Sequence, residues 1–397
     1  MHLVILAAGE GSRMRPITET TPKPLIQICG KSIIEHNIDM IIDEFEDIYI
    51  IVKYKQEVFR EYFWNEYKWK RVTYVEQGTE NWTGAAILSL KWNIDGEFIV
   101  LSGDDIYEAT DILKLKKQIG YATLCKQVEK PSDFWIFHVD SWSGKVLGII
   151  EKPTNTLYGN LANIGNHKFD SKILEELEKI PISPRWEREI TDLIDLYIKQ
   201  WTYSVVEATG RWITIGYPWD ILKAQDEIIG KYTETINNWA IIEQNVYIKW
   251  NIYLEEGVIL KSWTYIEWNV YIWKDSIIWP NAYIRWNTGI WTSSKIWAFV
   301  EVKNSFIGNH SSIPHLSYFW DSIIGNSVNI GWGSKVANLR HDEANIRAMV
   351  KSTLIDTGRR KLWAIIWDNA HIGIGSIIYP GRTIPTNGTT LPWEIVK

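Results

Sequence analysis

The first residues that could do chemistry follow a short apolar run at the start of the chain. "LVILAAG" leads into "EGSRMRP" and then "TPKPL", which places two glycines, Gly9 and Gly11, ahead of two cations, Arg13 and Lys23. Glycines let a turn close on a ligand, and the backbone N–H groups of such a turn bind phosphate oxygens. Arginine and lysine stabilise the charge that develops during phosphoryl transfer. The pattern therefore predicts a triphosphate-binding loop with Arg13 and Lys23 as catalytic groups.

The combined pattern, G-x-G-S-R-x-R-P followed by P-K-P, resembles that of the sugar-1-phosphate nucleotidyltransferases, a Rossmann-like family. Segments further along the chain match the family in the same order: "VEQGTENWTGAA", "LSGDD", "IIEKP" and "LANIG". The resemblance implies nucleotide contacts from Ala8, Gly9, Gly11, Gln77, Thr83 and Gly84, Mg²⁺ binding by Asp104, and hydrogen bonds to the sugar phosphate from Glu151 and Asn163.

The chemistry of that family requires little covalent help from the protein. A sugar phosphate is already an anion and attacks the α-phosphorus of the nucleoside triphosphate in line, so that pyrophosphate leaves. Asp104 ends an apolar run, where a carboxylate can hold Mg²⁺ against the phosphates. One departure is "WITIG", which has Thr214 where many relatives have Asp. The second protein ligand for Mg²⁺ therefore stays open.

The elements that must position these groups alternate along residues 1–230. Apolar runs such as "DIYIIV" and "EFIVLSGDD" alternate with helical stretches at 33–45 and 109–119, and 218–232 reads as a closing helix. This alternation predicts an α/β domain with a mostly parallel sheet.

The second half of the chain follows a six-residue period. Ile or Leu, and finally Val, recurs at every sixth position from Ile242 to Val302, with a small or β-branched residue four positions after each of the first ten. A strict hexad is typical of a parallel β-helix in which three hexads make one triangular coil. Coils of the hexapeptide families are left-handed. We therefore expect a domain of this kind over residues 231–397.

Tryptophan is out of place in this repeat. The chain has 24 Trp, several of them at corners of the hexads, such as Trp263, Trp268 and Trp286. Tight corners favour Asn, Asp or Gly, and glycine at these positions would give an ordinary hexapeptide sequence. We hypothesise that most Trp stand for glycine through the reading of UGA codons. Trp212 and Trp219, in "GRWITIGYPWD", lie where related enzymes carry Trp and are expected to be genuine.

A second set of candidate residues lies late in the coil. The stretch "FVEVKNSFIGNHSSIPHLSYFWDSIIGNSVNIGWGSKVANLRHD" resembles the acetyltransferase half of the bifunctional N-acetylglucosamine-1-phosphate uridyltransferase/glucosamine-1-phosphate acetyltransferases. A histidine suits such a site because a base of near-neutral pKa can take the proton of an attacking amine. The resemblance implies His315 as general base, sugar-phosphate binding by Arg285, Lys303, Tyr318 and Asn329, and placement of the acetyl group of acetyl-CoA by Asn338.

Composition restricts the partners and the location. The net charge is −6 and no run of Lys and Arg exceeds three residues, so nothing indicates nucleic-acid binding. Two cysteines, Cys29 and Cys125, fit a reducing compartment. The start of the chain lacks a cationic leader, and no apolar stretch could span a bilayer. We expect a cytoplasmic enzyme with UTP, sugar-1-phosphates, acetyl-CoA and Mg²⁺ as ligands, and the family resemblance implies a homotrimer.

Three functions fit the sequence. The first is a two-site enzyme that makes UDP-N-acetylglucosamine. The second is a monofunctional glucose-1-phosphate uridylyl- or thymidylyltransferase whose coil is structural; Lys303 and His315 argue against it. The third is a non-catalytic regulator with a degenerate nucleotidyltransferase fold, against which Arg13, Lys23 and Asp104 argue.

Overall fold

The computed structural model describes residues 1–80, 82–140, 142–155, 157–182, 188–231 and 235–397. The described residues form two compact units. The first comprises Met1–Glu10, Pro22–Ile26 and Ser32–Ile213, and the second comprises Gly11–Thr21, Gln27–Lys31 and Thr214–Lys397. Each unit is described by itself.

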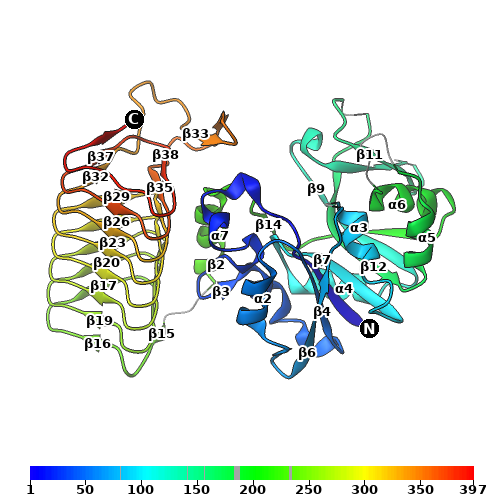
Figure 1. Ribbon diagram of the computed structural model, residues 1–397, viewed down its shortest axis with the longest axis horizontal. Coiled ribbons are helices and arrows are strands. Elements are labelled where there is room, and N and C mark those ends of the chain that lie inside the picture. The colour runs from blue at the N-terminus through cyan, green and yellow to red at the C-terminus, as the bar shows by residue number, and fades with distance from the viewer. Residues whose placement is uncertain (81, 141, 156, 183–187, 232–234) are drawn as a thin grey trace. The chain divides into compact units, whose positions relative to one another are not determined.

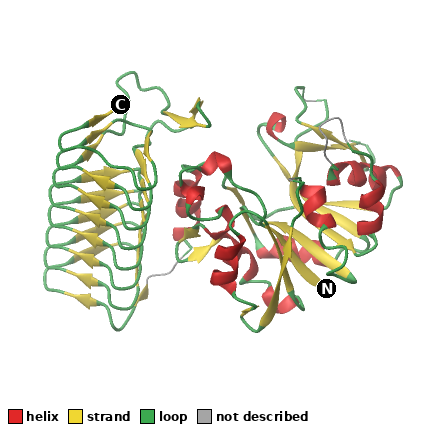
Figure 2. Ribbon diagram, in the orientation of Figure 1, coloured by secondary structure: helices red, strands yellow, loops and turns green. Residues whose placement is uncertain are grey.

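The first unit is built on a ten-stranded mixed sheet (Figures 1 and 2). Strands β1, β4, β6 and β7 are mutually parallel neighbours, and β12 runs antiparallel to β7. The spatial order is β11 (Val146–Glu151), β10 (Trp135–Val139), β12 (Leu161–Asp170), β7 (Glu97–Ser102), β1 (His2–Leu6), β4 (Ile48–Val52), β6 (Lys70–Glu76) and β5 (Glu66–Tyr67), while β9 (Tyr121–Gln127) joins β12 to β13 (Tyr203–Glu207).

Helices cover both faces of this sheet because successive strand residues point to opposite sides. Leu3 and Ile5 pack into one apolar core, and Val4 between them packs into the other. The first core includes residues of α1 (Ile33–Ile38), α2 (Gln56–Phe63) and α4 (Ala109–Lys116), and the second those of α3 (Thr83–Leu88), α5 (Ile173–Lys179) and α6 (Ile190–Lys199).

All three expected helices are shorter than their sequence patterns, and for 218–232 the helix α7 covers Asp220–Ile229. The stretch 33–45 forms α1 only as far as Ile38 and resumes as a 3₁₀ turn at Ile42–Glu44. α4 ends at Lys116 rather than at 119. In the described part of the chain, every helix is too short or too polar to cross a bilayer. The remaining short elements are η1 (Ser12–Met14), η2 (Ile17–Glu19), η3 (Lys23–Leu25), η5 (Pro131–Asp133), β2 (Gln27–Ile28), β3 (Lys31–Ser32), β8 (Asp105–Tyr107) and β14 (Trp212–Thr214).

The second unit contains α7 (Asp220–Ile229) and a coil of three parallel sheets, the expected left-handed β-helix. Ile248 pairs with Ile266 and Ile266 with Ile284, so one coil takes eighteen residues, or three hexads. The apolar hexad residues fill the interior; Leu260, Ile266 and Ile284 are fully buried.

The three sheets of the coil consist of strands of two or three residues. One contains β15 (Thr235–Ile236), β18 (Ile252–Leu254), β21 (Val270–Ile272), β24 (Thr288–Ile290), β27 (Phe306–Ile307), β30 (Ile323–Ile324), β35 (Ala364–Ile366) and β38 (Arg382–Ile384). The second contains β16 (Ile241–Ile242), β19 (Ile259–Leu260), β22 (Ile277–Ile278), β25 (Lys295–Ile296), β28 (Ser312–Ile313), β31 (Asn329–Ile330) and β36 (His371–Ile372). The third contains β17 (Tyr247–Lys249), β20 (Tyr265–Glu267), β23 (Tyr283–Arg285), β26 (Glu301–Lys303), β29 (Tyr318–Trp320), β32 (Lys335–Val336), β37 (Ile377–Ile378) and β39 (Ile395–Val396).

A hairpin interrupts the coil before its last turns. Its strands β33 (Arg347–Val350) and β34 (Thr353–Asp356) pair with each other and lie outside the three sheets. The chain then rejoins the coil at β35, which pairs with β30.

Many tryptophans occupy backbone conformations suited to glycine. Eight have positive φ between 52° and 82°, where a Cβ atom crowds the backbone. Phe299 and Leu316 share such angles, so a positive φ alone does not identify a glycine position. The eight are Trp64, Trp69, Trp201, Trp250, Trp263, Trp268, Trp286 and Trp393.

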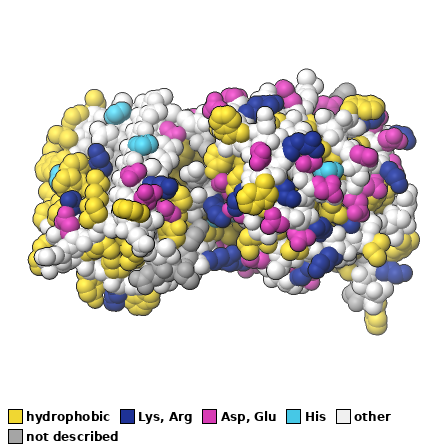
Figure 3. Space-filling view, turned by 90° about the horizontal axis from the view of Figure 1, so that it is seen from below, with side chains coloured by type: hydrophobic (Ala, Val, Ile, Leu, Met, Phe, Trp, Pro, Cys, Tyr) yellow, Lys and Arg dark blue, Asp and Glu magenta, His cyan; other side chains and the backbone are white. Residues whose placement is uncertain are grey.

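The surroundings of several tryptophans support the hypothesis that most Trp stand for glycine. Several are largely exposed, among them Trp142 at 96 % and Trp92 at 88 %, and in Figure 3 hydrophobic side chains gather over the coil. Five others bury an indole N–H that has no hydrogen-bond partner among the described residues, which costs free energy. These five are Trp82, Trp279, Trp291, Trp320 and Trp363.

Trp212 and Trp219 differ from these tryptophans in the contacts of their side chains. The indole N–H of Trp212 donates to Asp105 Oδ2 at 2.9 Å, and Trp219 is buried and stacked on Tyr217 at 4.8 Å. Both side chains therefore have partners that suit tryptophan.

We predict that protein isolated from its native cell has a mass lower than that of the printed chain by about twenty Trp-to-Gly differences. Peptide mass spectrometry would assign glycine at 263, 268 and 286 and tryptophan at 212 and 219. Tryptophan at the first three positions would contradict the recoding hypothesis.

For the chain expressed as printed, we expect Trp263→Gly to raise the free energy of unfolding by about 1 kcal/mol, because it relieves a left-handed conformation. Trp219→Gly is the matched control. It should lower the free energy of unfolding by about 3 kcal/mol through loss of a buried ring. Urea unfolding of both variants measures the difference.

Candidate functional site

A buried lysine forms an ion pair just beyond the end of β7. Lys23 lies at the start of η3, its side chain is 8 % exposed, and its Nζ is 2.6 Å from Asp104 Oδ2. The other oxygen, Asp104 Oδ1, accepts a hydrogen bond from the Ser102 hydroxyl at 2.9 Å. Burial raises the pKa of Asp104, but Lys23 and Ser102 outweigh burial and leave this pKa below its ordinary value. A lysine and an ionised carboxylate, both predicted site residues, are thus held together.

The predicted phosphate loop has an open backbone. A Cβ atom added at Gly9 would meet no atom within 4 Å, and Gly11 adopts a left-handed conformation with φ of 60°. The carbonyl of Gly11 accepts a hydrogen bond from the Thr18 hydroxyl at 3.0 Å, which fixes the turn. Ala8 before it is partly buried. The loop can therefore bring backbone N–H groups close to a phosphate.

Arg13 follows in η1 and is exposed. Its guanidinium lies 5.5 Å from the centre of the Tyr217 ring, and it forms no ion pair with a described carboxylate. Its charge is available to an anionic ligand.

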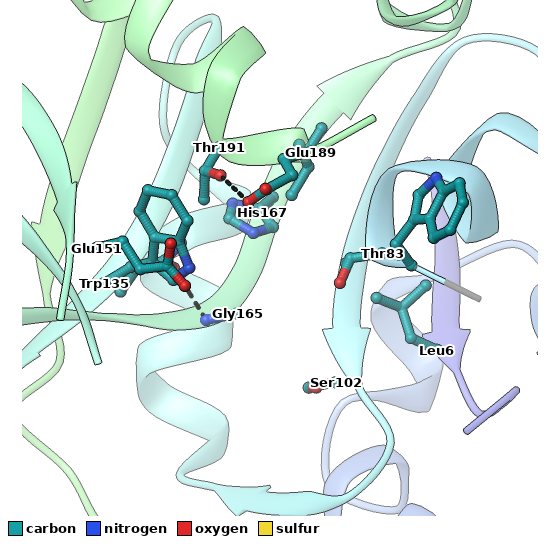
Figure 4. Close-up of a pocket in the computed structure, with 12 residues that line it drawn as sticks. Leu6, Thr83, Ser102, Trp135, Glu151, Gly165, His167, Glu189 and Thr191 are labelled. Carbon is teal, nitrogen blue, oxygen red and sulfur yellow. Dashed lines mark hydrogen bonds between the residues drawn. The ribbon is translucent and has the colours of Figure 1, made fainter. Parts of the chain in front are cut away.

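A cavity of about 310 Å³ opens at the carboxyl ends of β1 and β7 (Figure 4). Leu6 and Ser102, which are register partners at those strand ends, form part of its wall. Ligands of open α/β sheets bind at this end of the strands. The full lining is Leu6, Trp82, Thr83, Ser102, Trp135, Glu151, Asn163, Gly165, His167, Glu189, Ile190 and Thr191.

Three predicted residues line this cavity together: Thr83, Glu151 and Asn163. Thr83 starts α3 and is exposed, and Glu151 ends β11. The side-chain oxygen of Asn163 accepts hydrogen bonds from the Gly165 N–H at 2.9 Å and from the Thr123 hydroxyl at 3.5 Å. These bonds orient the amide, whose NH₂ group is the donor left for a sugar oxygen.

Gln77 and Gly84, also expected to contact the nucleotide, shape the loop beside it. Gln77 is buried, and its amide nitrogen donates to the carbonyls of Glu80 and Trp82 at 2.7 and 3.2 Å. A Cβ atom at Gly84 would lie 2.1 Å from the carbonyl oxygen of Arg188. Glycine at 84 therefore lets the first turn of α3 pack against the segment that leads into α6.

The sequence analysis did not identify His167, Glu189 and Thr191. Asn163 and His167 both lie on β12 and line the cavity. The pairing of β12 with β9 shifts its register between these two residues, so strand periodicity alone did not identify His167. Glu189 and Thr191 lie at the start of α6 and come from a distant segment, so only the fold reveals them.

His167 is electrically neutral in this cavity. It is buried, its Nδ1 lies 3.0 Å from the Tyr203 hydroxyl, and its ring stacks on Phe169 at 5.4 Å. Burial lowers the pKa of His167 to about 3. It can hydrogen-bond a ligand but does not carry charge at neutral pH.

The cavity also contains two of the unusual tryptophans. Trp82 precedes Thr83, and Trp135 is the register partner of Glu151 on β10. The ring of Trp135 is labelled in Figure 4, beside Glu151. Glycine at both positions would enlarge the cavity, because each indole ring forms part of its wall.

The donor set near the cavity fits a magnesium ion held with substrate phosphates. Among the described residues, no group of three His, Cys, Asp or Glu side chains could hold a metal ion alone. Mg²⁺ commonly binds through one or two carboxylates plus the oxygens of a bound nucleotide. Asp104, whose side chain is 43 % exposed, provides one such carboxylate.

On the coil, three predicted residues lie close together on one sheet. Arg285 and Lys303 are register partners on β23 and β26, and Tyr318 follows on β29 beside Glu301. Arg285 donates to Glu301 Oε1 at 2.7 and 3.1 Å. Burial, together with the negative charge of Glu301, raises the pKa of Tyr318 to about 12, so its hydroxyl stays protonated. The set can bind an anion and donate hydrogen bonds.

His315 lies at the corner that leads into β29. It is exposed, and its ring centre is 5.1 Å from that of Trp297. The Gly333 N–H donates to its carbonyl at 3.2 Å, which fixes the corner. Asn329 is exposed on β31 of the adjacent sheet, and Asn338 follows β32. These three groups come from successive turns of the coil, and no side-chain hydrogen bond joins them among the described residues.

Comparison with known proteins gives the class of the first unit. Residues 2–230 match the Nucleotidyl transferase family, so this part of the chain is a nucleotidyltransferase. A solved structure titled as a putative glucose-1-phosphate thymidylyltransferase from Bacillus anthracis in complex with a sucrose matches with a TM-score of 0.51 and 25 % identity. The match covers 56 % of this chain and 93 % of that one.

Some relatives match nearly the whole length of this chain, and these matches cover both units. A bifunctional protein GlmU of Methanocaldococcus jannaschii is 41 % identical over 98 % of this chain and 92 % of its own length. A bifunctional sugar-1-phosphate nucleotidylyltransferase/acetyltransferase of Sulfurisphaera tokodaii is 40 % identical over 100 % of this chain and 97 % of its own length. The chain belongs to the bifunctional GlmU family.

The two glycines of the first unit give a matched pair of variants. We expect Gly84→Ala to lower the free energy of unfolding by about 2 kcal/mol, because its Cβ overlaps the Arg188 carbonyl. Gly9→Ala should change this free energy by less than about 0.5 kcal/mol, because the space is open, yet weaken nucleoside triphosphate binding about tenfold or more. Urea unfolding measures the loss of stability, and calorimetric titration measures the loss of nucleotide affinity. Equal destabilisation of the two variants would contradict the prediction.

Proposed function

We propose that this chain makes UDP-N-acetylglucosamine in two reactions. The coil transfers an acetyl group from acetyl-CoA to glucosamine-1-phosphate, and the first unit then joins the product to UMP from UTP and releases pyrophosphate. The observation that carries the proposal is the ion pair of Lys23 with Asp104 beside a cavity lined by Thr83, Glu151 and Asn163. The whole-length likeness to bifunctional relatives supports the second reaction.

In the nucleotidyltransferase region, binding and charge stabilisation supply the catalysis. Glu151 and Asn163 hold the sugar, while Ala8, Gly9, Gly11, Gln77, Thr83 and Gly84 hold the nucleotide. Arg13 and Lys23 stabilise the charge on the α-phosphate as the sugar phosphate attacks and pyrophosphate leaves. Asp104 would hold a Mg²⁺ ion together with the substrate phosphates, and such an ion would neutralise further phosphate charge. Ionised Asp104 suits that role, because Lys23 and Ser102 lower its pKa.

In the coil, Arg285 and Lys303 bind the phosphate of glucosamine-1-phosphate, and Tyr318 and Asn329 orient the sugar. His315 takes a proton from the amine as its nitrogen forms a bond to the acetyl carbon, and the thiolate of coenzyme A leaves. Asn338 helps to place the acetyl group. The proximity of Arg285, Lys303 and Tyr318 supports this assignment.

The proposal extends to organisation. We place the domain boundary near residue 230, after α7, and propose a homotrimer in the cytoplasm in which neighbouring coils share the acetyl-CoA site. The alternative of a monofunctional uridylyl- or thymidylyltransferase is favoured by relatives that match only part of this chain, among them the Bacillus anthracis protein.

We expect Lys23→Ala to reduce pyrophosphate release by at least about a hundredfold, because a charge on the transferred phosphate is left unbalanced. Acetyl transfer should stay within about twofold of the parent. His315→Ala should abolish acetyl transfer and leave pyrophosphate release unchanged. Light scattering should show no change in the mass of this variant. Both activities are measured on each purified variant, with UTP and dTTP compared. Loss of both activities in one folded variant would contradict two separate sites.

Removal of divalent cations should also separate the reactions. With EDTA, pyrophosphate release should fall to background and recover on addition of Mg²⁺, while acetyl transfer persists. Asp104→Asn should raise the Mg²⁺ concentration for half-maximal uridylyl transfer by about tenfold, because one anionic ligand is lost. Unchanged Mg²⁺ dependence in this variant would remove Asp104 from the metal site.

A further inference from the structure

A lysine that follows β4 binds the loop that follows β6. Its Nζ donates to three successive backbone carbonyl oxygens at 2.6, 2.9 and 3.4 Å, and the residues are Lys53 and, in the loop, Gly78, Thr79 and Glu80. An ammonium group has three N–H donors, so this one can satisfy all three carbonyls. Carbonyl dipoles that point toward one place repel one another, and the positive charge of Lys53 offsets this repulsion. The conformation of the loop therefore depends on Lys53.

The strand register places Lys53 close to Gln77. β4 and β6 are parallel, and Val52 is the register partner of Glu76. The backbone N–H of Gln77 continues this pairing and donates to the Val52 carbonyl at 2.9 Å. Lys53 and Gln77 therefore leave the sheet at the same edge, and both side chains reach the same loop.

The two side chains share one acceptor. The Gln77 amide nitrogen donates at 2.7 Å to the Glu80 carbonyl, the oxygen that also accepts from Lys53, and at 3.2 Å to the carbonyl of Trp82. Carbonyl oxygens only accept, so these contacts require the NH₂ group of the amide to face the loop. Among the described residues, Gln77 Oε1 accepts no hydrogen bond. Both acceptors are backbone atoms, which glycine at 82 would retain.

We propose that Lys53 is a positioning residue for nucleotide binding: it holds the loop carbonyls that orient the Gln77 amide, so that Gln77 Oε1 accepts a hydrogen bond from the nucleobase. The inference rests on the proposed function, which supplies a uracil base. Uracil and thymine have an N3–H group, whereas N3 of cytosine carries a lone pair. A fixed acceptor favours the first two bases, because cytosine would leave Oε1 without a donor. Lys53 thus contributes to base selection through Gln77.

The first experiment removes the ammonium group. Lys53→Met and, as a second variant, Lys53→Gln are made in the full chain, and folding is checked by circular dichroism. We expect KM for UTP to rise about tenfold and kcat to stay within about twofold, because a contact to the base is equally strong in the ground state and the transition state. An unchanged KM in both folded variants would overturn the proposal.

Lys55→Met is the matched control. It removes the same charge two residues away, where the Lys55 ammonium lies 5.7 Å from the centre of the Tyr54 ring. KM for UTP should stay within about twofold of the parent, because the contacts with the loop are intact. An equal rise of KM in Lys53→Met and Lys55→Met would assign the effect to charge alone and would overturn the positioning role.

Base discrimination separates positioning from a general loss of structure. Calorimetry gives the dissociation constants of UTP, dTTP and CTP for the parent and for Lys53→Met. The preference for UTP over CTP should fall about fivefold in the variant, because CTP does not use the fixed acceptor. Equal weakening of all three nucleotides would leave Lys53 a structural role only and would overturn the proposal.

A double-mutant cycle tests the route through Gln77. In the Gln77→Met background, Lys53→Met should raise KM for UTP by less than about twofold, because the group that it positions is already absent. A tenfold rise in both backgrounds would show that Lys53 acts by another route.

The nucleotide that reacts separates this inference from the proposed function. Binding of dTTP with the pattern predicted for Lys53 and Gln77, without turnover of UTP, would support the inference and reject uridylyl transfer. Turnover of UTP that is insensitive to Lys53→Met would support uridylyl transfer and reject the inference.

Discussion

The register of parallel strands brings the functional groups of both units together. In the first unit, pairing of Leu6 with Ser102 aligns the ends of β1 and β7, so that the turn after one strand and Ser102 of the other lie at the same edge of the sheet. In the coil, an eighteen-residue turn aligns Arg285 with Lys303. Parallel pairing fixes these positions because a shift of one residue would turn every interior side chain outward.

The two candidate sites differ in whether a carboxylate balances the charge of their lysine. Lys23 is buried and already paired with Asp104, so its charge is balanced before any ligand arrives. Lys303 is flanked by aromatic rings and lacks a carboxylate within ion-pair distance in the described chain. The first arrangement suits a site in which a metal ion and a nucleotide exchange partners with the lysine. The second suits direct capture of a phosphate dianion.

The positions of the tryptophans bear on the hypothesis that the cell makes this chain with glycine in their place. The coil needs residues that accept left-handed corners and small side chains beside its binding face. Trp263 and Trp286 adopt left-handed angles, and Trp320 covers two cations. These are the places where a missing Cβ matters most, since glycine removes both the backbone crowding and the ring. Glycine in place of tryptophan would therefore relieve the strain at the corners and remove rings from both candidate sites.

The sequence by itself determined the two architectures and most of the candidate residues. Hydrophobic periods of two and six identify strands and coils, because they reflect which side chains must be buried, and local motifs mark Lys23, Asp104 and Asn163. The lengths of α1 and α4 were overestimated, since tertiary packing ends a helix before its apolar pattern does. Only the tertiary structure joined Glu189 and Thr191 to the cavity and assigned Gly84 a packing role. These groups come from separate segments whose meeting depends on the path of the whole chain, and no local pattern encodes that path.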